Sequence, residues 1–162
     1  VTRADFEDDT ALAGMRFQRK LERAAYVAGG SNYAAPTQLL GDFLKDKTSS
    51  RFGEVLPTYA AGTAFADLRE VLPSPVIEAL KKAAVDMDRR LKGFACPDAI
   101  LTGAETRTSS PVRIPRDKDT LQHPEVQGLY PTGEGAGYAG GITSACVDGV
   151  KCAKAVIEAI SK

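Results

Sequence analysis

The sequence predicts an α+β fold for this chain of 162 residues. Over much of the first two-thirds, apolar residues recur every three or four positions, which is typical of amphipathic helices. The last third instead holds short runs rich in Thr, Ser, Val and Ile, followed by a glycine-rich stretch and one more helical pattern. We therefore expect a mainly helical region at 1–104 and a strand, a glycine-rich turn and a helix within 105–162.

Three helices are expected in the first region. The first covers about residues 11–28 and is ended by two glycines. The second is short, beginning near Pro36, which suits a first helical turn, and running to Leu44. A polar stretch at 45–53 is expected to be an exposed loop. The third helix covers 74–92, where Ser74 is a candidate N-cap.

The second region is expected to be extended before its final helix. A short apolar run at 99–102 leads into residues 105–114, which alternate as an extended chain does. Residues 126–131 are a candidate strand, and residues 141–161 form the last helical pattern.

Composition excludes several classes of function. The 21 basic and 21 acidic residues balance and form no basic block, so neither nucleic acid nor an anionic membrane is indicated as a partner. No apolar run approaches the ~18 residues of a membrane span. One histidine and three scattered cysteines make neither a metal site nor a disulfide framework. A cytoplasmic protein without a bound metal is expected.

The glycine-rich turn is the most distinctive feature. Five glycines fall within residues 133–141, together with one carboxylate, Glu134. Glycine permits positive φ and the close approach of a ligand, and the start of the following helix offers free N–H groups. Residues 135–140 satisfy G-x-G-x-x-G literally. The usual dinucleotide fingerprint, however, needs a second strand with an acidic residue about 20 residues on, and only one helix follows here. The alternative to ligand binding is that these glycines only permit tight packing of a helix against a sheet.

Several stretches resemble the C-terminal portion of bacterial FAD-dependent dehydrogenases, which belong to the flavoproteins with two dinucleotide-binding domains. They are residues 105–114 (ETRTSSPVRI), 128–142 (GLYPTGEGAGYAGGI) and 144–149 (SACVDG). Residues 29–38 (GGSNYAAPTQ) are also similar.

This resemblance implies that residues 1–104 form a helical cap or substrate-side region and that 105–162 complete an FAD-binding α/β domain. It implies that Glu134 binds a ribityl hydroxyl of FAD and that backbone N–H groups near Ile142 face the flavin. The turn itself would be formed by Gly133, Gly135, Gly137, Gly140 and Gly141.

The resemblance also implies partners. In such proteins an N-terminal Rossmann region holds the ADP half of FAD, and that region is missing from these 162 residues. We therefore expect the isolated chain to bind FAD weakly or not at all and to be inactive alone. The complete protein would transfer hydride between a small-molecule substrate and the flavin, with NAD(P)H as a possible electron partner. No residue is indicated for proton transfer.

A substrate site is suggested by Arg107, Arg113 and Tyr138. The two arginines are six residues apart, so a regular strand places them on one face, where they would clamp a carboxylate or a phosphate. Exposure on a strand surface is the alternative. Tyr138 either stacks near the flavin or packs internally.

A second interpretation is a free-standing α+β module that binds a small anion or a protein partner. The first interpretation predicts an exposed apolar face on the strand and the last helix, whereas a self-contained module buries that face.

Overall fold

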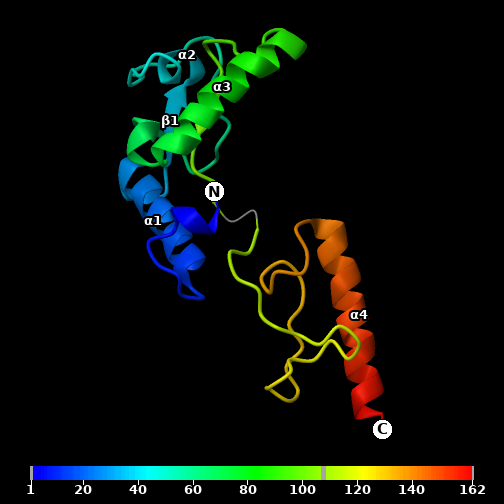
Figure 1. The fold of residues 1–162 in the computed structure, drawn as a ribbon. Helices are drawn as coiled ribbons and strands as arrows, with labels where there is room; N and C mark the ends of the chain where they lie inside the picture. The colour runs from blue at the N-terminus through cyan, green and yellow to red at the C-terminus, as the bar shows by residue number, and fades with distance from the viewer. Residues whose placement is uncertain (1, 107–108, 162) are drawn as a thin grey trace. The chain divides into compact units, whose positions relative to one another are not determined.

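A computed structural model describes residues 2–106 and 109–161 and confirms the α+β class. The described residues form two compact units: unit 1 comprises residues 19–106, and unit 2 comprises residues 2–18 and 109–161. The elements, labelled in Figure 1 where space allows, are two 3₁₀ helices, η1 (Arg3–Asp5) and η2 (Leu68–Glu70), and α1 (Ala13–Ala28), β1 (Ala35–Leu39), α2 (Leu40–Phe43), β2 (Thr63–Phe65), α3 (Ser74–Arg90), β3 (Ile100–Thr102) and α4 (Ile142–Ile160).

A three-stranded mixed sheet organises unit 1. Its order is β2–β1–β3, with β1 parallel to β2 and antiparallel to β3. Thr37 of β1 pairs with Phe65 and with Thr102, so these side chains share one face of the sheet. Gln38 pairs with Leu101, and both point to the other face.

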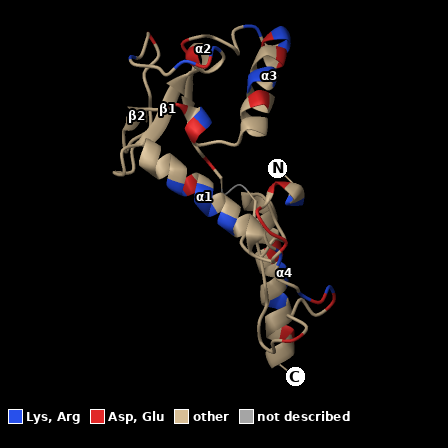
Figure 2. Cartoon of the chain, turned by 60° about the vertical axis from the view of Figure 1, so that its left-hand side comes forward, with Lys and Arg blue, Asp and Glu red and all other residues tan. Residues whose placement is uncertain are grey.

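The apolar core of unit 1 lies on the face of Gln38 and Leu101. Leu101 packs against a cluster supplied by α2, η2 and α3, which consists of Leu40, Phe43, Leu68, Ile77 and Ala84. Helix α3 therefore contributes one apolar stripe to the core, while charges of both signs alternate along its remaining surface (Figure 2).

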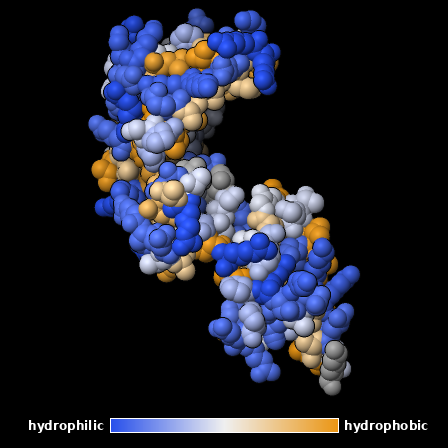
Figure 3. All heavy atoms as spheres, viewed as in Figure 1, coloured by the Kyte–Doolittle hydropathy of each residue, from blue (hydrophilic) through white to orange (hydrophobic). Residues whose placement is uncertain are grey.

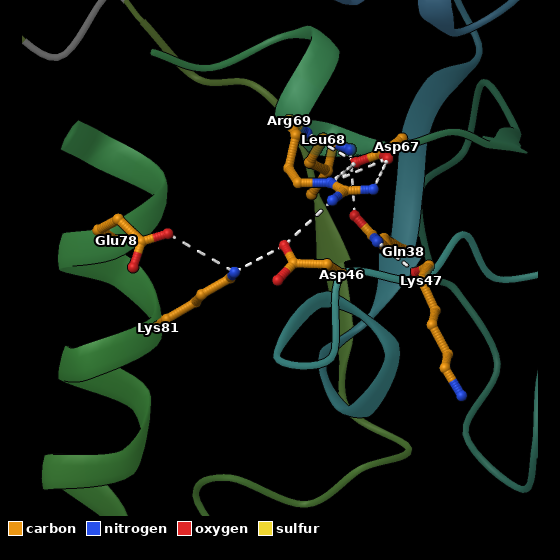
Figure 4. Close-up of polar contacts among 8 residues, drawn as sticks. All are labelled: Gln38, Asp46, Lys47, Asp67, Leu68, Arg69, Glu78 and Lys81. Atoms are coloured by element: carbon orange, nitrogen blue, oxygen red, sulfur yellow. Dashed lines mark hydrogen bonds and ion pairs between the residues drawn. The ribbon is translucent and has the colours of Figure 1, made fainter. Parts of the chain in front are cut away.

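A buried amide fastens the central strand to its surroundings. The side chain of Gln38 is fully buried; its Nε2 donates to the carbonyl of Lys47 at 2.7 Å, and its Oε1 accepts from the N–H of Leu68 at 3.0 Å (Figure 4). Ser49, also buried, accepts from the Leu39 N–H at 2.9 Å. The stretch at 45–53 is thus a loop and is mostly exposed, as expected, but Ser49 within it is buried.

Asp46 links the same loop to two neighbouring elements. Its carboxylate lies 2.7 Å from Lys81 of α3 and 3.2 Å from Arg69 of η2, and Arg69 in turn pairs with Asp67 (Figure 4). The hydrogen bond from Lys81 lowers the pKa of Asp46. Because Asp46 is about half exposed, solvent screens these pairs, and they fix the orientation of the loop more than they stabilise the fold.

The expected helix at 36–44 was wrong over its first half. Pro36 lies inside β1, and the helix is confined to α2. Proline does suit a first helical turn, but β1 is paired on both sides by strands from distant parts of the chain, and this non-local pairing outweighs the local preference.

The expected distribution of strands was also wrong. Most of the regular structure in region 1–104 is helical, as expected, but this region also contains all three strands found among the described residues. Residues 126–131 form a turn, with the Leu129 N–H donating to Val126 and the His123 N–H donating to Leu129. An extended segment becomes a strand only beside a hydrogen-bonding neighbour, and none lies beside this one among the described residues of unit 2.

The three long helices were predicted correctly to within two residues at each end, as α1, α3 and α4. The apolar run at 99–102 is β3 with one preceding residue. Within residues 2–106 and 109–161, no helix is both long and apolar enough to cross a membrane, and no group of three or more potential metal ligands occurs.

Replacing Gln38 with Met tests the role of the buried amide. Met has a similar volume but leaves the Leu68 N–H and the Lys47 carbonyl without partners, so we expect a loss of about 1–3 kcal/mol in the free energy of unfolding. Urea denaturation measures this. Gln127→Met, at an exposed position, is the control and should change stability little; equal stability of the two variants would contradict the role given to Gln38.

Candidate functional site

The glycine-rich turn lies directly before α4 in unit 2. Within the turn, the Gly137 N–H donates to the Glu134 carbonyl at 2.9 Å and the Tyr138 N–H donates to the Gly133 carbonyl at 3.0 Å. Gly133 and Gly137 have φ angles of 72° and 85°, which side chains disfavour. These two glycines therefore shape the turn itself.

The turn is held against residues 110–114. The Ser110 hydroxyl donates to the Gly135 carbonyl at 3.1 Å, and the Ile114 N–H donates to the Ala136 carbonyl at 3.1 Å. A Cβ on Gly137 would lie 2.8 Å from the Val112 carbonyl oxygen, closer than carbon and oxygen can approach. One side of the turn is thus fixed by the chain's own packing.

For the remaining glycines of the turn, neither a positive φ nor close packing requires the absence of a side chain. Gly135, Gly140 and Gly141 lack a positive φ. No described heavy atom lies within 4 Å of a Cβ built on Gly135 or Gly140, and the nearest to one built on Gly141 is 3.6 Å away. The chain itself would accommodate side chains here. This side of the turn therefore has room for a second molecule to approach the backbone.

Two further features of the open side fit a polar ligand. The Glu134 side chain is half-buried, and its carboxylate makes no hydrogen bond to any residue that the structure describes. Helix α4 begins after Gly141 without a side-chain cap, and Ile142 is 94% exposed. The N–H groups of its first turn therefore point to solvent with the positive end of the helix dipole.

A buried ion pair anchors the turn to α4. Arg116 donates to both carboxylate oxygens of Asp148, at 2.7 and 3.0 Å, and to the Pro131 carbonyl at 2.8 Å. Asp148 also accepts from the Gly133 N–H at 2.9 Å and from the Thr132 hydroxyl at 3.0 Å. The first residues of the turn are thus tied to the middle of the helix.

The charges of this pair are strongly stabilised. Hydrogen bonding from Arg116 holds the pKa of Asp148 far below its ordinary value against the opposing effect of burial, with further help from Gly133 and Thr132. Asp148 in turn raises the pKa of Arg116. Both groups are charged at neutral pH, so the charge of Arg116 is compensated within the chain.

Tyr138 and Arg113, two residues expected in a substrate site, lie together. The Arg113 guanidinium lies 4.3 Å from the centre of the Tyr138 ring, and Arg116 lies 3.7 Å from it. The Tyr138 hydroxyl donates to the Ile114 carbonyl at 2.9 Å, which fixes the ring. Arg107, the third expected residue, lies outside the described residues.

The sequence did not reveal the pairing of Arg116 with Asp148. The two residues are 32 positions apart, and Arg116 follows a proline in an irregular segment with no periodicity. One signal was present: Asp148 is the only acidic residue of the last helical pattern before Glu158, and apolar residues surround it in the chain. A carboxylate in such a place needs a partner.

Helix α4 turns its apolar side to solvent. Asp148 and Cys152 are its buried residues. On another side an exposed apolar stripe, which we call the α4 stripe, follows the three- and four-residue spacing of one helix face and consists of Ile142, Cys146, Val150, Ala153, Ile157 and Ile160. Apolar surface is visible along this helix in Figure 3, and Figure 2 shows few charges on it.

Comparison with known proteins assigns the first two-thirds of the chain to a family. Residues 1–108 match the model of the family described as "FAD-dependent protein, C-terminal domain-like". The chain belongs to this family. An uncharacterized protein of Clostridium beijerinckii is 54% identical over 158 residues, which are 98% of this chain but only 30% of that protein. The family match ends before the glycine turn, whereas the similarity to the longer protein extends through the turn and α4.

The ion pair has a testable pH dependence. A lowered folded-state pKa means that Asp148 contributes stability above the ordinary carboxyl pKa of about 3.9, and that this contribution is lost as pH falls toward its folded value. Asp148→Asn leaves Arg116 buried without a counter-charge, so we expect a loss of about 3 kcal/mol at pH 7.

Urea unfolding of unit 2 at pH 7 and pH 3 measures this effect, with Asp119→Asn at an exposed position as the control. The difference between the native chain and Asp148→Asn should shrink at the lower pH. A difference that stays the same at both values would show that the carboxylate charge is not what stabilises the turn.

Proposed function

We propose that this chain is part of a longer FAD-dependent oxidoreductase and that its glycine-rich turn faces the ribityl chain and flavin of FAD. Membership of the FAD-dependent family and the 30% coverage of the C. beijerinckii protein support a role within a longer protein. The observation that carries the proposal for the turn is the open space at Gly135 and Gly140, which lack a side chain for no reason within the chain.

Different residues of the turn would contact different parts of FAD. Glu134 would accept a hydrogen bond from a ribityl hydroxyl, and Gly133, Gly135, Gly137, Gly140 and Gly141 would let the backbone approach the cofactor. The first N–H groups of α4, at Gly141 and Ile142, would face the pyrimidine side of the flavin, where the helix dipole stabilises the negative charge of the reduced form. When bound, FAD supplies the hydride-transfer chemistry of such enzymes.

The Arg116–Asp148 pair would then act as a positioning device. It touches Gly133 and Pro131 at the entry of the turn and lies at the middle of the helix whose N-terminus follows the turn. Because the pair fixes both ends of this segment, it would hold Glu134 and the helix start in one geometry before FAD arrives.

The α4 stripe would pack on the remaining part of the FAD-binding domain, the Rossmann region that these residues do not include. Six exposed apolar positions on one helix face are more than single surface residues would explain. The same exposure argues against a free-standing module, which would bury this face. Hydride exchange with a small-molecule substrate, with NAD(P)H as candidate electron partner, completes the proposed activity.

A chimera tests the cofactor proposal directly. The matched 158 residues of the C. beijerinckii protein are replaced by this chain, and bound flavin is read from the visible absorbance of the purified protein. We expect a yellow chimera, and Glu134→Ala within it should weaken FAD binding about tenfold or more, since a hydrogen bond to a charged acceptor is lost.

Glu125→Ala, an exposed carboxylate nine residues earlier, is the matched control and should leave FAD binding unchanged. The chain by itself should bind FAD weakly or not at all. A folded but colourless chimera, beside a yellow C. beijerinckii protein, would contradict the proposal.

A lysine in the α4 stripe tests the docking of this helix. Ile157 is 58% exposed, so Ile157→Lys should leave the unfolding of the isolated chain nearly unchanged. In the chimera the same change buries a charge, and we expect loss of flavin or of soluble protein. Val147→Lys, on the charged side of α4 at 50% exposure, should be tolerated in both proteins. Full tolerance of Ile157→Lys in a yellow chimera would show that the stripe docks on nothing.

A further inference from the structure

Unit 2 contains a cavity of about 510 Å³ whose polar lining is cationic. It is lined by Arg113, Pro115, Arg116, Lys118, Leu121 and Tyr138. No carboxylate is among these residues. Every lining residue belongs to unit 2, and Tyr138 also belongs to the glycine-rich turn, so the cavity lies beside that turn.

The three cations of this cavity have different roles. Arg116 is nine-tenths buried, and Asp148 compensates its charge, so it serves as part of the floor. Its guanidinium carbon lies 3.7 Å from the centre of the Tyr138 ring, and the Tyr138 hydroxyl donates to the Ile114 carbonyl. Arg116 and Tyr138 together therefore form a fixed floor for the cavity.

Arg113 and Lys118 carry the charges that are open to a ligand. Both are exposed, and neither forms an ion pair with a residue in the described part of the chain. The neighbouring carboxylate of Asp117 is directed to its own turn, where one oxygen accepts from the N–H groups of Asp119 and Thr120 at 3.0 and 2.7 Å. Arg113 also rests on Tyr138, which restricts its guanidinium while leaving its N–H groups able to donate.

We propose that this cavity binds a small organic anion, with Arg113 and Lys118 holding its carboxylate or phosphate group and Tyr138, Pro115 and Leu121 contacting its carbon body. A volume of about 510 Å³ exceeds what one inorganic ion fills and lies in the range of small-molecule sites. Guanidinium and ammonium groups above an apolar floor are the donors that such anions require. The assignment of this anion as the substrate rests on the proposed function; its binding does not.

Isothermal titration calorimetry of the 162-residue chain at low ionic strength tests the inference, with benzoate and inorganic pyrophosphate as the two probes. We expect at least one of them to bind. Arg113→Gln and Lys118→Gln should each weaken that binding about tenfold, because each removes a charge-assisted contact. Arg90→Gln, an exposed arginine at the end of α3 in unit 1, removes the same charge elsewhere and should leave the affinity unchanged.

The two probes separate the sources of the anion. Binding of benzoate assigns the cavity to a carboxylate substrate, and binding of pyrophosphate alone assigns it to the phosphates of a dinucleotide. Binding of neither probe overturns the inference, as does an equal loss in Arg90→Gln. Flavin binding by the chimera is measured independently of anion binding. A colourless chimera that still binds the anion contradicts only the cofactor proposal. A yellow chimera that does not bind the anion contradicts only the proposed anion site.

Discussion

The ion pair between Arg116 and Asp148 is the interaction on which unit 2 depends. Unit 2 has little else to hold it: the buried apolar residues among its described positions are small, namely Ala13, Pro131, Ala136 and Cys152. Unit 1 by contrast buries large side chains such as Phe43, Leu68 and Ile77 beneath its sheet. A unit without a sheet and without a large apolar core must be fixed by directed contacts. The carboxylate of Asp148 supplies them by accepting from Arg116 and from the adjacent residues Thr132 and Gly133.

Local pattern predicted the long helices because each carries its information in consecutive residues. The stripe of α3 and the apolar run of α4 are periodic by themselves, and proline or glycine marks where these helices begin. The prediction for β1 was wrong for the opposite reason. Its five residues include a proline and locally favour a helix start, and they form a strand because they pair with strands 28 and 65 positions away. The prediction of a strand at 126–131 was wrong because no hydrogen-bonding partner strand lies beside this segment among the described residues of unit 2.

The candidate site residues also differ in whether the sequence reveals them. The glycines and Glu134 stand in one short stretch, so the sequence itself displays their clustering. Backbone geometry then separates them: Gly133 and Gly137 satisfy the needs of the turn, whereas Gly135 and Gly140 do not. No sequence pattern distinguishes a glycine required by φ from one that leaves room for a ligand. The pairing of Arg116 with Asp148 was equally hidden, because it joins an irregular segment to a helix.

Helix α4 has a buried polar contact on its inner side and an exposed apolar stripe on its outer side. A helix at the surface of a finished domain places apolar residues inward and charges outward. In α4 the inward side instead carries Asp148, which the glycine turn and Arg116 satisfy completely, and the α4 stripe faces outward. Such a helix is stable in water only at a cost, since its apolar area stays hydrated. The arrangement is reasonable if the helix lies between two layers, with the turn on one side and a further domain on the other. Contacts on both sides would fix the direction of its axis, and hence the point at which the N–H groups of Gly141 and Ile142 meet a ligand.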